Sequence, residues 1–190
     1  MYVTNDSVST RFETMSNKEL GSFIRGELKK IGITSRQVSV RVRDCGYSTS
    51  VDCTVKDLSI SLRKVEEIAS QVEYIRYDPY AQEILSGCNI FVHVCYDWQI
   101  MRDAKDAVRE SVKAEMAKIN DNCSHKLYTN EEGKDVWMIP CKHEDNNGHV
   151  WFTYHVGKMN DSCDRQFNTW EAFVDYMVGQ TAILNARKAA

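Results

Sequence analysis

The sequence has 190 residues, of which 43% are hydrophobic, 10% aromatic and 27% charged, a composition typical of a folded soluble protein rather than a disordered one. The formal net charge of -3 argues against a strongly basic nucleic-acid coat and against a strongly acidic nucleic-acid mimic. Residues 1–14 lack the apolar core of a signal peptide, and no apolar run is long enough to span a bilayer. We therefore expect a cytoplasmic protein whose seven cysteines are thiols.

The first predicted element is a helix that follows a loose arm of residues 1–15. Ser16 and Glu19 stand at the spacing of a capping box, in which each side chain accepts a hydrogen bond from the backbone of the other. Apolar residues then recur at helical spacing, and Gly32 favours a left-handed stop. The apolar stripe consists of Leu20, Phe23, Ile24, Leu28 and Ile31.

Strict alternation over residues 37–57 predicts a half-buried β-hairpin. The three valines between Val38 and Val42 alternate with polar residues, and after a break that contains Gly46 the alternation resumes and continues to Val55. One face of this hairpin is apolar and needs helices to cover it. The other face is left to meet water or a partner.

A second helix is predicted after Ser61, a candidate N-cap, with an apolar stripe that reaches Ile75 and a stop at Asp78-Pro79. Residues 89–96 are apolar on nearly both faces, which is typical of a central strand. A right-handed crossover through the second helix would place this strand parallel to one strand of the hairpin.

A long helix with a narrow apolar stripe and charged flanks is predicted over residues 99–119, and residues 120–122 break the pattern. Three short strands follow, and Asn168 is a candidate N-cap of a last helix, with Glu171 at its third position. The strands are predicted over residues 126–129, 136–143 and 149–156.

These elements predict an α+β fold. Residues 16–119 form a two-layer helix/sheet sandwich in the order helix-strand-strand-helix-strand-helix, and residues 120–190 form a small antiparallel β-β-β-α unit packed against it.

Two phrases carry a family resemblance, VSVRVRDCGYSTSVDCTVKD in the hairpin and QEILSGCNIFVHVCY at the third strand. Through them, about residues 18–96 resemble one of the large polyvalent protein-associated domains, which are small α+β modules of giant proteins from bacteriophages and conjugative elements. The resemblance implies an association with mobile-element entry and with conflict against host defences, and it carries over no catalytic residue. For a phage-encoded protein, it implies the cytoplasm of the host cell.

Two Cys-x-His pairs make the sharpest candidate for a metal site, namely Cys123 with His125 and Cys141 with His143. Four thiolate and imidazole ligands suit tetrahedral zinc, although structural zinc sites usually contain Cys-x-x-Cys knuckles, which this chain lacks. The alternative is that these are ordinary buried thiols and surface imidazoles, with no cofactor bound.

A Cys–His nucleophilic pair is the enzymatic alternative, with Cys141 or Cys163 as the attacking group and His143 or His155 as the base. No family signature flanks either cysteine. The sequence also lacks a phosphate-cradling glycine loop, a GxSxG elbow and an HExxH helix.

The polar face of the hairpin is the stronger functional candidate. Residues 17–44 contain seven basic and three acidic residues, against a net charge of -3 for the whole chain. Such a surface suits an acidic protein or a phosphate backbone, and an aromatic ring at the turn could stack on a base. The alternative is a solvated face whose charges neutralise one another. The candidate binding residues are Lys29, Lys30, Arg36, Arg41, Arg43, Tyr47 and Lys56.

The sequence therefore favours a non-enzymatic binding protein of a phage or mobile element that occupies a surface of a host factor, such as a defence protein. A nucleic-acid-binding module that uses the basic face of the 37–57 hairpin is the runner-up, and a cysteine/histidine-dependent enzyme comes third. No membrane partner is expected, and self-association is left open.

Overall fold

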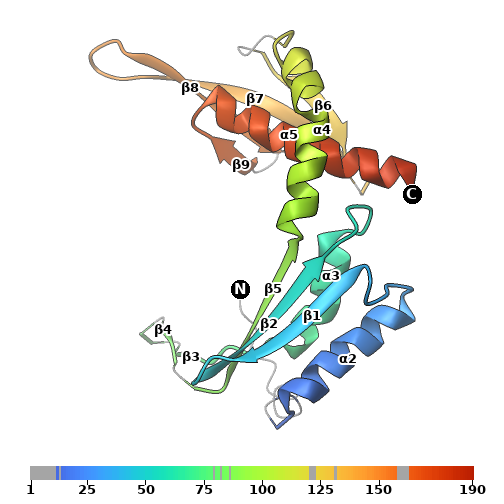
Figure 1. Ribbon diagram of the computed structural model, residues 1–190. Helices are drawn as coiled ribbons and strands as arrows, with labels where there is room; N and C mark the ends of the chain where they lie inside the picture. Colours follow the sequence, from blue (N-terminus) through green and yellow to red (C-terminus); the bar gives the residue numbers. More distant parts are fainter. Residues whose placement is uncertain are drawn as a thin grey trace. The chain divides into compact units, whose positions relative to one another are not determined.

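The computed structural model describes residues 12, 14–78, 80, 81, 83–85, 87–119, 123–130, 132–157 and 163–190. It has the predicted α+β class, with helices packed on two main sheets (Figure 1). By packing, the chain divides into two compact units, the first from residues 1–101 with 186–190 and the second from residues 102–185. The predicted arm of residues 1–15 and the predicted break at residues 120–122 lie largely outside the described residues.

The first unit is built on a three-stranded sheet in the order β1-β2-β5. Strands β1 (Val38–Asp44) and β2 (Ser48–Val55) are the antiparallel hairpin, and β5 (Asn89–Tyr96) is parallel to β2, as the crossover predicts. A separate two-residue pairing joins β3 (Tyr77–Asp78) to β4 (Glu83–Ile84).

Helix α2 (Asn17–Lys30) begins with the predicted capping box. The Ser16 hydroxyl accepts a hydrogen bond from the Glu19 backbone N–H at 3.3 Å, and the Glu19 carboxylate accepts one from the Ser16 backbone N–H at 2.8 Å. Behind this start, Leu20, Ile24 and Leu28 are buried on one stripe. The stripe docks α2 on the sheet, and the chain leaves the helix through Gly32 at φ 83°.

The alternating valines of the hairpin point into this core. Val38, Val51 and Val55 are almost completely buried, and they pack in one cluster with α2 and with α3 (Leu62–Ala69). Because successive side chains of a strand point to opposite faces, the residues between the valines form the other face of the sheet. The two-layer sandwich predicted for this part of the chain is therefore confirmed.

Two details of the first unit differ from prediction. Strand β5 is an edge strand beside β2, and β2 is central. The apolar residues on the outer side of β5, such as Phe91, therefore lie on the uncovered face instead of in a second core. Helix α3 ends at Ala69 and continues only as a 3-10 turn to Val72, because Tyr74 leaves the helix to pair with Ile90.

The second unit contains a four-stranded antiparallel sheet in the order β6-β7-β8-β9. Three strands, β6 (His125–Thr129), β7 (Asp135–Glu144) and β8 (Val150–Gly157), match the predicted ones closely. The fourth, β9 (Cys163–Phe167), was not predicted, so the β-β-β-α order is corrected to β-β-β-β-α.

Helices α4 (Trp98–Met116) and α5 (Trp170–Ala189) cover the buried face of this sheet (Figure 1). Val112 of α4 and Phe173 of α5 share one core with Met138 and Val156 of the strands. The predicted ranges 16–119 and 120–190 assign the long helix to the first domain, whereas its buried residues pack with the second sheet.

The start of α5 lies one residue later than predicted, because the hydroxyl of Thr169, and not the side chain of Asn168, accepts the capping hydrogen bond from the Ala172 backbone N–H at 3.2 Å. Among the helices of the described ranges, none combines the length and the hydrophobicity that crossing a bilayer would require.

Candidate functional site

The uncovered side of the first sheet brings together three of the predicted binding residues. We call it the open face, and it lies opposite the face that α2 and α3 cover. Arg41 and Arg43 of β1 project from it, and Lys56 extends the same side of β2, because its backbone N–H still bonds to the Gln37 carbonyl at 2.7 Å. All three long side chains are exposed.

One carboxylate partly neutralises this face. Asp52 accepts hydrogen bonds from Arg43, at 3.1 Å from Nε and at 2.6 Å from a terminal guanidinium nitrogen. This bonding, with the charge of Asp52, raises the pKa of Arg43. Arg41 lies directly opposite Asp52 in the strand register, yet no ion pair of Arg41 or Lys56 occurs among the described residues. The open face therefore carries three cations and one occupied carboxylate.

Strand β5 contributes side chains that the sequence did not predict for this surface. Its parallel register sets Phe91 beside Ser50, His93 beside Asp52 and Cys95 beside Thr54. His93 and Cys95 are exposed and Phe91 is half-buried. The apolar run of residues 89–96 suggested burial on both sides, and only the pairing of β5 with β2 reveals that these residues border the arginines.

The other predicted binding residues lie elsewhere in the first unit. Lys29 and Lys30 occupy the last turn of α2, which is in the helix layer on the opposite side of the sheet from Arg41, and Lys30 pairs with Glu27 at 2.6 Å. Arg36 is exposed in the connection between α2 and β1.

Tyr47 lies at the hairpin turn. It is 82% exposed beside Gly46, whose φ of 82° the turn requires. Tyr47 also borders a hollow of about 310 Å³, whose wall includes Met15 and Ile90. The ring is thus available to a partner at the end of the sheet rather than in the middle of the open face.

The two predicted Cys-x-His pairs do not come together. His125 pairs with Met138 in the strand register and therefore shares the face that the helices cover, whereas Cys141 and His143 alternate with Met138 and project from the other face. Cys123 is exposed before β6. Within the described ranges, no group of three or more His, Cys, Asp or Glu side chains is arranged to hold a metal ion.

Two histidines of the second sheet converge on one hydroxyl. The Thr153 oxygen lies 2.9 Å from Nε2 of His143 and 3.1 Å from Nε2 of His155, and the His143 ring also stacks on Trp151 with centroids 5.4 Å apart. The Nε2 atom of each histidine is thus bonded to a threonine and not to a cysteine. Cys141 lies directly opposite Thr153 in the strand register.

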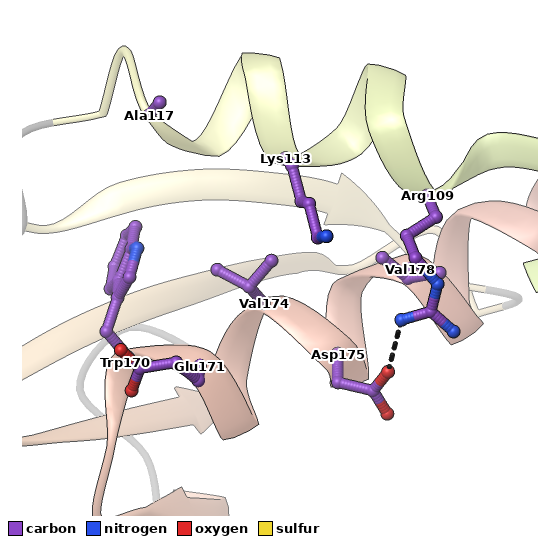
Figure 2. Close-up of a pocket in the computed structure, with 8 residues that line it drawn as sticks. All are labelled: Arg109, Lys113, Ala117, Trp170, Glu171, Val174, Asp175 and Val178. Carbon is purple, nitrogen blue, oxygen red and sulfur yellow. Dashed lines mark hydrogen bonds and ion pairs between the residues drawn. The ribbon is translucent and has the colours of Figure 1, made fainter. Parts of the chain in front are cut away.

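A groove runs between α4 and α5 in the second unit (Figure 2). It holds about 420 Å³, within the range of ligand pockets. Arg109, Lys113 and Ala117 form one wall at helical spacing. The residues of α5 that line the groove are Trp170, Glu171, Val174, Asp175 and Val178.

Ion pairs close one end of this α4–α5 groove. Asp175 lies 3.1 Å from Lys105 and 3.1 Å from Arg109, both on α4. Burial alone would raise the pKa of Asp175, but the hydrogen bonds from the two cations outweigh it and lower that pKa below its usual value. Gly179 leaves the space that Lys105 occupies, since a Cβ there would lie 3.1 Å from Cε of Lys105.

No family model matches the chain, and no curated protein or solved structure matches it significantly. The functional assignment therefore depends on the geometry and the chemistry of the surfaces described above.

Proposed function

We propose that the chain is a non-enzymatic binding protein of a phage or another mobile element, and that it acts by occupying an acidic surface of a host protein, such as a defence factor. The open face of the first sheet is the contact surface. The resemblance of residues 18–96 to the phage and conjugative-element modules motivates the biological setting.

One observation carries the proposal: Arg41 and Lys56 stand exposed on a helix-free sheet face without an ion pair among the described residues. Two unpaired cations beside the Arg43–Asp52 pair give this face an excess of positive charge. Complementary charge speeds the encounter with an acidic surface and fixes the register of the complex. Residues of β5, including Phe91, would add the apolar contact area that binding needs.

Capture from host lysate tests this proposal with matched charge reversals. The Arg41→Glu and Lys56→Glu double variant should lose a host protein that the wild-type chain retains. The Lys29→Glu/Lys30→Glu double variant, an equal change of charge in the helix layer, should retain it. If no host protein is retained, or if all three proteins retain it equally, the open face is not the contact surface.

A nucleic-acid-binding module is the second candidate, because three cations in adjoining strands could follow a phosphate backbone. Fluorescence anisotropy with single-stranded and double-stranded oligonucleotides decides between the candidates. The nucleic-acid reading requires affinity that falls steeply with salt and with reversal of Arg41 and Arg43. An affinity that neither change affects would remove this candidate.

A further inference from the structure

The walls of the α4–α5 groove carry opposite charge. Its α4 side presents Arg109 and Lys113, and its α5 side presents Glu171 and Asp175 (Figure 2). Between them, Val174, Val178 and the Trp170 ring of α5 form an apolar floor. A partner that fits this groove must therefore offer an apolar strip flanked by acidic groups on one side and basic groups on the other.

Among the described residues, not all of these charges have a partner. Arg109 and Asp175 pair with each other across the groove at 3.1 Å. Among the described side chains, Lys113 pairs with Glu110 of its own helix at 3.3 Å, and both side chains are more than half exposed, so that pair contributes little. Glu171 makes no ion pair within the described part of the chain. Lys113 and Glu171 are thus the charges left for a partner.

We infer that the occupant of this groove is a second copy of the chain, related by a two-fold axis. A two-fold axis in the plane of the contact could run along the groove or across it. An axis across the groove would set α4 against α4 and α5 against α5, so like charges would meet. An axis along the groove sets the basic wall of each copy against the acidic wall of the other, and each Lys113–Glu171 contact is then made twice.

This arrangement also covers the apolar floor, because Val174 and Trp170 of both copies would lie at its centre. The contact is independent of the open face, which belongs to the first unit. Loss of dimerisation and loss of host-protein binding are therefore separable outcomes.

Charge exchange provides the test, with sedimentation velocity over protein concentrations from about 1 µM to about 500 µM. The wild-type chain should show a concentration-dependent dimer that weakens with salt. Lys113→Glu and Glu171→Lys should each weaken it about tenfold or more, because every pair becomes a repulsion. Lys64→Glu, the same charge change on an exposed residue of α3, should leave it unchanged.

Two recovery experiments make the test specific. The double variant Lys113→Glu/Glu171→Lys should dimerise again, and so should an equimolar mixture of the two single variants, since both restore opposite charges in each contact. Thermal melting verifies that every variant is folded. A wild-type chain that stays monomeric throughout, single variants that dimerise like wild type, or a failure of both recoveries would each overturn the inference.

Discussion

Arg41 and Asp52 lie directly opposite each other on β1 and β2, yet the carboxylate bonds to Arg43 instead. The alternation of the hairpin predicted that these residues share one face, and the structure bears this out. The alternation did not predict which arginine would lack an ion pair among the described residues, because that depends on side-chain conformation. Nor did it place His93 beside Asp52, because the register of a parallel strand distant in sequence has no local signal.

At the same scale, we expect the ion pairs of Asp175 to make an acid-sensitive contribution to stability. The pKa of Asp175 is lowered in the folded state. Its ion pairs therefore stabilise the fold fully at pH values above the unfolded-state pKa of about 4, and this stabilisation is lost as the pH falls through the folded-state pKa. Asp175→Asn should lower the free energy of unfolding at pH 7 by at most about 1 kcal/mol, given solvent screening. The difference from wild type should shrink on acidification.

Urea denaturation at neutral pH and at about pH 3 measures this difference. Glu66→Gln removes an exposed carboxylate of α3 without an ion pair among the described residues and is the control. If Asp175→Asn lowers the free energy of unfolding as much in acid as at neutral pH, the stabilising role of the ionised Asp175 carboxylate is contradicted.

Cys53 yields a second prediction at the residue scale. The thiol is fully buried, and burial, with the charge of Asp52 and the influence of Cys95, raises its pKa to about 11. Because the thiolate is the reactive form, iodoacetamide at about pH 8 should leave Cys53 unmodified in the native protein while it modifies the exposed Cys45. Peptide mass spectrometry reads both sites. Equal modification rates would show that the strand core opens readily.

At the scale of elements, the two predicted serine caps of the first unit behave differently. Ser16 makes the full capping box, whereas Ser61 occupies the N-cap position of α3 without a side-chain capping bond. Ser16→Ala should therefore cost about 1 kcal/mol of unfolding free energy, and Ser61→Ala should cost distinctly less. Chemical denaturation of both variants measures this, and equal costs would contradict the difference in capping.

The strength of the local pattern decided which elements could be predicted. The valines from Val38 to Val42 and the capping box at Ser16 are short-range signals, and both elements formed as expected. Strand β9, with the sequence CDRQF, has no alternation of apolar residues, and its pairing with β8 supplies the hydrogen bonds that define it. The edge position of β5 also follows from tertiary pairing, which composition does not encode.

At the scale of the whole molecule, the described residues form two hydrophobic cores that share no residue. Phe173 is completely buried in the second core, so Phe173→Ala should cost about 3–5 kcal/mol there. We expect hydrogen exchange to accelerate in β7 and β8 while peptides that contain Val51 and Val65 of the first core keep their protection. Hydrogen exchange followed by mass spectrometry measures both regions in one experiment. Equal loss of protection in both cores would show that they unfold as one cooperative unit.

The site could be predicted only in part. The hairpin of the open face has a local alternating pattern, whereas the pairing of β5 with β2 has no local sequence signal. Alternation alone predicted the place of Arg41, Arg43 and Lys56 on this face. Nearness in sequence assigned Lys29 and Lys30 to the same surface, but they belong to the helix layer. The α4–α5 groove had no sequence signal, because all four strands of the second sheet lie between its two helices in the sequence.

The central claim is that the open face makes contact with a protein partner. Isothermal titration of the host protein captured from lysate, once purified, tests it most directly against the wild-type chain, Arg41→Glu, Lys56→Glu and Lys29→Glu. We predict that each reversal on the open face weakens the affinity about tenfold, while Lys29→Glu changes it less than about twofold. Equal affinities for all four proteins would contradict the claim.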